Sequence, residues 1–128
     1  MAFTFSKAER LCSRKQIDRL YAEGHRFVAF PFSVQWMVVD TPTSPCQVMI
    51  VAPKRRFKHA VDRNHVRRLT RECYRMRKQH LYDLLNEHGI GIVLSLVYIH
   101  NEIMSIEQMG HKMDKLMAAL EKETLATL

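Results

Sequence analysis

Residues 61–78 read VDRNHVRRLTRECYRMRK, and the rest of the chain is interpreted outward from this stretch. At about 100° per residue, four of its apolar residues fall within a sector about 80° wide: Val66, Leu69, Cys73 and Met76. The opposite arc, about 140° wide, contains no acid: Arg63, Asn64, Arg67, Arg68, Arg71, Tyr74, Arg75 and Lys78. We therefore predict a helix from about Val61 to Lys78 that buries one narrow face and presents a cationic face.

The cationic face carries like charges at helical spacing. The pairs Arg63/Arg67, Arg67/Arg71 and Arg71/Arg75 repel and together cost on the order of 1 kcal/mol. Solvated helix faces usually mix the two signs, so a purely solvent-exposed role explains this pattern poorly. Phosphate groups would relieve the repulsion, because planar guanidinium groups bind phosphate oxygens in pairs. The pattern favours a nucleic-acid partner.

The segment before the helix adds to the same charge. Between Pro53 and His80 lie eleven of the chain's 20 Lys and Arg residues but only two of its 13 acids, so the whole excess of positive charge is local. The basic loop, which contains Lys54, Arg55, Arg56 and Lys58, leads into a helix N-terminus whose dipole also attracts anions. Binding to a membrane surface would need large apolar side chains beside the charges, and the apolar sector is already required by the core.

The flanking segments predict a small sheet with helices. Ser13 can cap a helix that carries Ile17, Leu20 and Tyr21 on one side and ends at Gly24. Strand patterns follow at Phe30–Val39, Gln47–Ala52 and Ile92–Ile99, with turn residues from Thr41 to Pro45. A last helix, from about Ser105 to Glu123, has a stripe that we assign to the core: Ile106, Met109, Met113, Leu116, Met117 and Leu120.

A helix between two apolar strands predicts a β-α-β unit, so the expected fold is α+β, a two-layer α/β sandwich. A chain of 128 residues that is 47% hydrophobic fits a single domain over residues 1–128. No apolar run has the length of a signal peptide or a membrane span, so we expect a cytoplasmic protein. Cys12, Cys46 and Cys73 form no closely spaced pair, which predicts reduced thiols with no disulfide and no zinc.

Residues 54–72, KRRFKHAVDRNHVRRLTRE, resemble the signature of the protein subunit of bacterial ribonuclease P: a basic pair, Ala-Val, and an Arg-Asn-Arg core followed by two basic residues and Arg-Glu. The opening, with Phe5-Ser6-Lys7 and Arg10-Leu11 ahead of Ile17, Leu20-Tyr21 and Gly24, also looks like that family's N-terminal region. The resemblance extends from about Phe5 to Glu123 and is most specific in its centre.

The resemblance implies a ribonucleoprotein in which a large RNA subunit carries the catalytic chemistry. This chain would bind that RNA and the 5′ leader of precursor tRNA, as a monomer in the holoenzyme, and Mg²⁺ would be held mainly by the RNA subunit and substrate. It also implies a left-handed β-α-β crossover. RNA contacts are expected from the matching residues Arg55, Arg56, Arg63, Asn64, Arg67, Arg68 and Arg71, to which the charge pattern adds Lys54, Lys58 and Arg75.

A leader-binding cleft between the first helix and the sheet would include Ile17, Tyr21, Phe32, Val34 and Trp36. A strand register shifted by one residue would exchange Trp36 for Gln35. His65 departs from the family pattern, which has Arg there. It lies beside the apolar sector, so it either donates one hydrogen bond to RNA or marks the boundary of the core without a special role.

Other functions remain open on the sequence alone. The seven histidines are scattered without a His-x-x-x-His pair, and no catalytic constellation is visible, so we expect no catalytic residue in the protein itself. A structural RNA-binding protein, ribosomal or for assembly, could use the same helix. A DNA-binding module would be expected to show a short helix-turn-helix joint, which the sequence lacks.

Overall fold

The computed structural model describes residues 5–39 and 44–128 of the chain. The sheet has strands β1 (His25–Ala29), β2 (Phe32–Val39), β3 (Cys46–Val51) and β4 (Gly91–Tyr98) in the spatial order β1-β2-β4-β3. The pairs β1/β2 and β2/β4 are antiparallel, whereas β3 and β4 are parallel. Strands were therefore predicted correctly at three places, while β1 was not anticipated, because most of its residues are polar or exposed.

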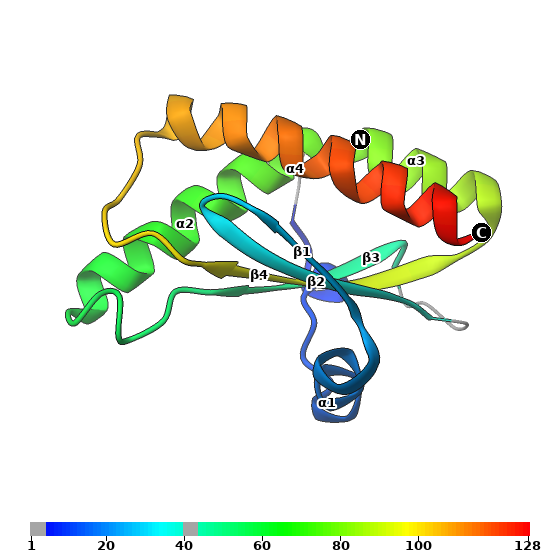
Figure 1. Ribbon diagram of the computed structural model, residues 1–128, viewed down its shortest axis with the longest axis horizontal. Coiled ribbons are helices and arrows are strands. Elements are labelled where there is room, and N and C mark those ends of the chain that lie inside the picture. Colours follow the sequence, from blue (N-terminus) through cyan, green and yellow to red (C-terminus); the bar gives the residue numbers. More distant parts are fainter. Residues whose placement is uncertain (1–4, 40–43) are drawn as a thin grey trace.

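The helices are the short 3₁₀ helix η1 (Lys7–Glu9) and α1 (Arg14–Glu23), α2 (Ala60–Arg77), α3 (Gln79–His88) and α4 (Ile106–Thr127). Helices α2, α3 and α4 cover one face of the sheet, and α1 lies on the other (Figure 1). The predicted α+β fold is thus confirmed. Helix α3 was not predicted as a separate element, and of the predicted turn at 41–45 only Ser44 and Pro45 lie within the described residues.

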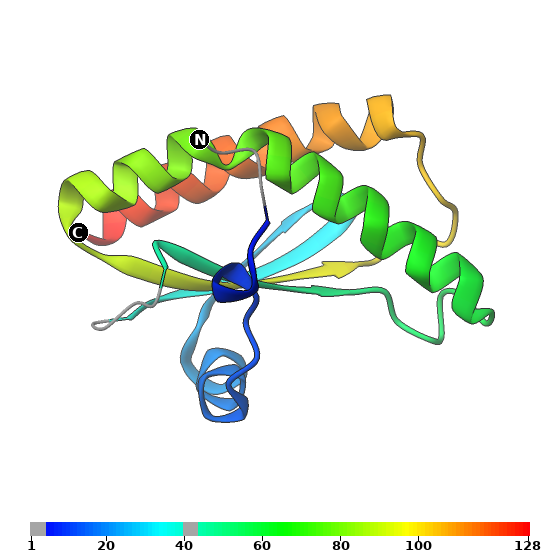
Figure 2. The same ribbon diagram turned by 180° about the vertical axis from the view of Figure 1, so that it is seen from behind.

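The connection between the parallel strands runs through α2 and α3. In Figure 1 both β3 and β4 run from right to left below these helices, and β3 lies farther from the viewer than β4. Figure 2 shows the reverse side, with α2 and α3 in front. Viewed from the helices along the strand direction, the chain therefore steps to the left. The crossover is left-handed, against the general preference.

The main core lies between the sheet and the three covering helices. Alternate residues of β2 and β4 face it as cross-strand neighbours: Phe32 opposite Tyr98, Val34 opposite Leu96 and Trp36 opposite Leu94. The helices contribute buried side chains of α2 and α4: Val66, Cys73, Met109, Met113, Leu116, Met117 and Leu120. The methionine-rich stripe is therefore core, as predicted, except that Ile106 at its start is 45% exposed.

A smaller core lies under α1. Leu20 packs there with Leu11, Met37, Val39 and Val93, which point to the opposite side of the sheet from the main core. The Ser13 side chain accepts a hydrogen bond from the Gln16 N–H at 3.3 Å, and the helix ends at Gly24, as predicted. A Cβ on Gly24 would lie 2.5 Å from the Leu20 carbonyl oxygen, so this position requires glycine.

No helix in the described ranges is both long and apolar enough to cross a membrane. Cys46 and Cys73 are buried, Cys12 is exposed, and all three thiols are free. Burial raises the pKa of the Cys46 thiol to about 12 and also raises that of Cys73. The two buried cysteines therefore act as small apolar residues, and Cys12 is left as the accessible thiol.

Candidate nucleic-acid interface

Helix α2 begins and ends within one residue of the prediction, but its buried sector is wider. Val66 and Cys73 are buried as expected and Leu69 is partly buried, whereas Met76 is 50% exposed. Tyr74 and Lys78 were assigned to the cationic arc, and that assignment is wrong, because their exposures are 0% and 4%. The arc that remains is narrower and holds Arg63, Asn64, Arg67, Arg68 and Arg71.

This difference arises because Tyr82 of α3 and the N-terminal segment both cover the second half of α2: the Tyr74 hydroxyl lies 3.2 Å from that of Tyr82, and the Lys78 ammonium lies over the Tyr82 ring. The ring of Phe5 packs edge-on against Tyr74 at 6.1 Å between centroids. The Glu9 carboxylate forms a buried salt bridge with Lys78. A helical wheel cannot anticipate such coverage, because these contacts come from residues outside the helix.

The arginines of α2 differ in their partners. Arg75 donates to Glu72 through Nε at 3.2 Å, and Arg77 pairs with Asp114 at 2.7 Å, so these two charges are neutralised within the chain. Arg63 donates to the Phe57 and Lys58 carbonyl oxygens at 2.9 and 3.0 Å, and Arg67 donates to the Asn64 side chain. Among the described residues, no carboxylate pairs with Arg63, Arg67, Arg68 or Arg71.

The Glu72 and Arg75 pair lies at the edge of this arc. The hydrogen bond from Arg75 lowers the pKa of the Glu72 carboxyl, and the same bond raises the pKa of Arg75. The carboxylate thus stays ionised and attached to Arg75. Arg75 is consequently a weaker candidate for phosphate contact than the four arginines without a carboxylate.

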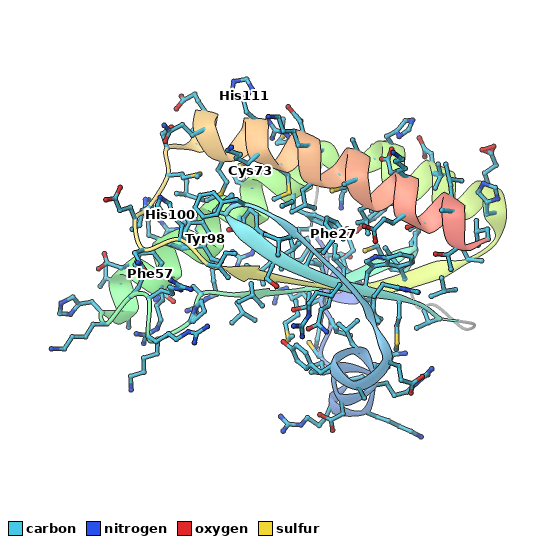
Figure 3. The ribbon with its side chains drawn as sticks, in the orientation of Figure 1. Phe27, Phe57, Cys73, Tyr98, His100 and His111 are labelled. Carbon is cyan, nitrogen blue, oxygen red and sulfur yellow. The ribbon has the colours of Figure 1, made fainter. Side chains whose placement is uncertain are left out.

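The basic loop is held by several contacts, while its other cations are exposed. Phe57 is buried against Tyr98, with ring centroids 5.8 Å apart, and Figure 3 shows the two side chains together at the end of β4. The Arg56 guanidinium donates to Asn101 at 2.9 Å. The loop cations Lys54, Arg55 and Lys58 are exposed. Because Arg63 donates to two loop carbonyls, loop and helix form one continuous cationic surface.

His65 is exposed on α2, outside both the core and the centre of the arginine arc. It therefore lies on the flank of the interface, where the helical wheel placed it.

The second expected site is beside α1, and there the sequence prediction was partly wrong. Tyr21 is 46% exposed and its hydroxyl lies 3.5 Å from Ser95, and Ile17 is half-buried. Phe32, Val34 and Trp36, however, are at most 1% exposed and face α2 to α4 on the other side of the sheet. They cannot line a surface with α1. The Trp36 indole instead donates to Glu123 of α4 at 3.2 Å.

The correct strand residues are those shifted by one position, because side chains alternate between the two faces of a sheet. Ser33, Gln35 and Met37 of β2 share the α1 side with Arg26 and Val28 of β1, which are their register partners or near neighbours. Val28 is 64% exposed. The surface beside α1 thus combines exposed Tyr21 and Val28 with polar strand residues.

Sequence reasoning also missed two cations, Lys7 and Arg10. Both are exposed, and Arg10 lies in the same groove as Arg67 and Arg71. Both residues belong to the N-terminal stretch that resembles the family's opening, but that resemblance predicts nothing about contact with α2.

Comparison with known proteins identifies the family. A family model described as Ribonuclease P matches residues 5–121. A Ribonuclease P protein component of Porphyromonas gingivalis (strain ATCC 33277) is 34% identical over 114 residues, covering 88% of this chain and 83% of the relative. The corresponding protein of Chlorobium phaeobacteroides is 35% identical over 86 residues, covering 62% of this chain and 59% of the relative.

Solved structures agree on the fold. An RNase P protein mutant of Staphylococcus aureus superposes with a TM-score of 0.70 at 19% identity, covering 90% of each chain. The RNase P protein from Thermotoga maritima gives 0.66 at 19% identity, covering 85% of this chain and 94% of that one. With the arginine arc, the matched central motif and the left-handed crossover, these similarities have one reading: the chain belongs to the family of ribonuclease P protein components.

Proposed function

We propose that this chain acts as the RNA-binding subunit of a ribonuclease P particle, in which it holds the catalytic RNA and the 5′ leader of precursor tRNA during leader removal. Membership of the family places it in tRNA processing, as part of an endoribonuclease complex with an RNA partner. The observation that carries the finer proposal is the arc of half-buried Arg63 and Arg67 with exposed Arg68 and Arg71, none of which forms a salt bridge with a carboxylate of the described chain.

These arginines suit a phosphate backbone. Arg63 and Arg67 are held by hydrogen bonds to loop carbonyls and to Asn64, so little side-chain freedom remains to be lost on binding. Arg55, Lys54 and Lys58 continue the surface around the N-terminus of α2. Neutralising several phosphates releases counterions, so binding should depend steeply on salt.

The leader would lie on the surface beside α1. Single-stranded RNA is commonly bound by stacking unpaired bases on exposed aromatic rings. Tyr21 offers such a ring, with Ile17 and Val28 as apolar neighbours on the same side of the sheet. On this side of the sheet, half-buried Ser33 of β2 and exposed Arg26 of β1 supply hydrogen-bonding groups for bases, ribose or phosphate, whereas Gln35 is buried.

The chemistry is assigned to the RNA. Mg²⁺ prefers hard oxygen ligands and keeps several waters, so phosphates of the RNA subunit and substrate are its natural ligands in this particle. The protein residues would position the two RNAs. We assign one copy of the chain to each particle, in the cytoplasm.

The test is reconstitution. The protein is mixed with an in vitro transcript of a bacterial ribonuclease P RNA at low magnesium, and removal of the leader from precursor tRNA is followed. The expected result is strong stimulation by this chain and weak stimulation by Arg67→Gln/Arg71→Gln. Lys115→Gln/Lys122→Gln removes the same charge from the exposed side of α4 and serves as the matched control.

If the native chain binds the RNA without stimulating cleavage, it is a structural RNA-binding protein and the catalytic proposal is wrong. Equal stimulation by the α2 double variant and by the control would instead remove α2 from the interface.

A further inference from the structure

The N-terminal segment crosses the open edge of β3, and Figure 2 shows it passing in front of the sheet between α2 above and α1 below. The Leu11 N–H donates to the Val48 carbonyl at 3.0 Å, and Arg10 forms an isolated parallel bridge with Val48. The Gln47 side chain donates to the Ala8 carbonyl at 3.1 Å. The segment is therefore attached along β3 and does not hang free.

A buried ionic cluster fixes this segment to the junction of α2 and α3. The Glu9 carboxylate is 6% exposed and accepts hydrogen bonds from Lys78, from the Tyr82 hydroxyl at 2.6 Å and from the Ser6 N–H at 2.8 Å. Burial alone would raise the pKa of Glu9, but these hydrogen bonds outweigh it and hold that pKa below its usual value. The carboxylate therefore stays ionised at neutral pH.

Such a pair is a poor source of stability, because desolvating both charges offsets most of their attraction. The salt bridge between Glu9 and Lys78 instead fixes the position of the N-terminal segment against α2. With Glu9 held at Lys78, the neighbouring Arg10 is brought beside Arg67 and Arg71, although these three cations repel one another.

The result is a groove of about 290 Å³ at the edge of β3, with an apolar floor that includes Leu11, Val48 and Ile50, and with Arg10, Arg67 and Arg71 around it. A second hollow of about 550 Å³ adjoins it through Arg10 and Cys12 and adds Lys7, Gln16 and Gln47. No carboxylate of the described chain lines either of them. By contrast, the larger groove between α2 and α4 contains charges of both signs.

We propose that this pair of hollows is a second RNA-binding track, which receives the phosphate backbone of an RNA strand as it passes from the arginine face of α2 across the edge of β3 toward α1. Arg10 and Lys7 contact phosphates, and the Gln16 and Gln47 amides bind phosphate or ribose oxygens. Glu9 is a positioning residue, since it acts only by holding Arg10 in place. The inference rests on the proposed function and extends its RNA surface to the N-terminal segment.

The first test measures the salt dependence of binding to a bacterial ribonuclease P RNA. Arg10→Gln and Lys7→Gln should each weaken binding and reduce the slope of log affinity against log salt by about 0.7 to 0.9. Lys122→Gln, exposed on α4, is the matched control with the same loss of charge and should leave the slope unchanged. If Arg10→Gln behaves like Lys122→Gln, the track does not exist.

The second test uses Cys12, which lines both hollows and is the exposed cysteine of the chain. Saturating ribonuclease P RNA should slow the alkylation of Cys12 by iodoacetamide at least about tenfold. Undiminished alkylation under conditions where the RNA is fully bound would overturn the track. It would leave the proposed function standing, because that function is tested by the α2 double variant in the reconstitution.

The third test separates position from charge. Glu9→Gln adds one positive charge, which by itself would strengthen binding to a polyanion. If Glu9 positions Arg10, the variant should bind the RNA more weakly, and introducing Arg10→Gln into it should have little further effect. Tighter binding by a Glu9→Gln protein that retains native circular dichroism would show that the position of the segment is irrelevant. Should that variant fail to fold, the Arg10 and Cys12 tests still decide the proposal.

Discussion

Replacing Arg67 and Arg71 by Gln should make the protein more stable and a weaker RNA binder at the same time. The double substitution removes the like-charge pairs Arg63/Arg67, Arg67/Arg71 and Arg71/Arg75, each of which costs about 0.2 to 0.5 kcal/mol. It breaks no salt bridge of the described chain; it removes the hydrogen bond from Arg67 to Asn64 and the weaker attraction of Arg71 for Glu72, whose direct partner is Arg75. Because Arg75 is already paired with Glu72, the expected gain is about 0.5 to 1 kcal/mol, or roughly 2 to 5 °C in Tm.

The loss of binding follows from the same two charges. Each phosphate contact contributes about 0.7 to the salt slope for single-stranded RNA and about 0.9 for a duplex, so the variant should lose about 1.4 to 1.8. Between about 50 and 200 mM salt, its deficit relative to the native chain should shrink by about 7- to 12-fold. Filter binding over this range measures the slope, and thermal unfolding by circular dichroism measures the stability.

Both measurements must move together for the reasoning to hold. The control Lys115→Gln/Lys122→Gln carries the same charge change on α4 and should alter neither by a comparable amount. A double variant that is less stable than the native chain would mean that the two arginines make stabilising contacts within the protein. In that case the position of Arg67 and Arg71 on the surface would be explained by protein stability and would not support RNA binding.

Three further outcomes are expected. Gly24→Ala should destabilise the protein by about 1 to 3 kcal/mol in urea unfolding, because its Cβ would meet backbone oxygens of Leu20 and Trp36. The control is Gly110→Ala, whose Cβ would meet only the movable end of the Arg77 side chain. Equal losses of stability in the two variants would contradict the requirement for glycine at position 24. Near pH 8, iodoacetamide should modify only the exposed thiol, Cys12, in the native chain and all three thiols in denaturant, since burial raises the pKa of Cys46 and Cys73. Rapid modification of a second thiol in the native chain would refute this prediction. The hydrogen bond to Glu121 raises the pKa of His80, so any stability from this pair is present below pH 6.5 and is lost as the pH rises through the raised pKa. An NMR titration should show that shift, and Glu121→Gln should abolish it; a shift that survives would assign it to another group.

The sequence predicted an element correctly where the spacing of apolar residues followed a single helical periodicity. The spacing of apolar residues such as Val66 and Cys73 was enough to place α2, because the buried face of a helix carries an apolar residue every three or four positions. The same reasoning misplaced Tyr74 and Lys78, since their burial comes from contacts outside α2, with Phe5, Glu9 and Tyr82. Periodicity carries no information about such contacts.

The site beside α1 shows a different limit. The alternation in β2 correctly separated Phe32, Val34 and Trp36 from Ser33 and Gln35, but it could not say which set faces α1. The large apolar set was assigned to RNA, whereas the structure uses it for the main core under three helices. The number of helices on each face of the sheet depends on the whole chain. Helix α3, which the sequence did not predict, is one of the three helices that cover the core face.

The strand order has a consequence for synthesis. Strand β4 is central, between β2 and β3, although it is the last strand to be made. While the ribosome is still translating the segment before Gly91, the two earlier strands have open, hydrogen-bonding edges with nothing between them. A nascent chain stalled in that interval should be prone to aggregate, and release of β4 completes the sheet in a single step.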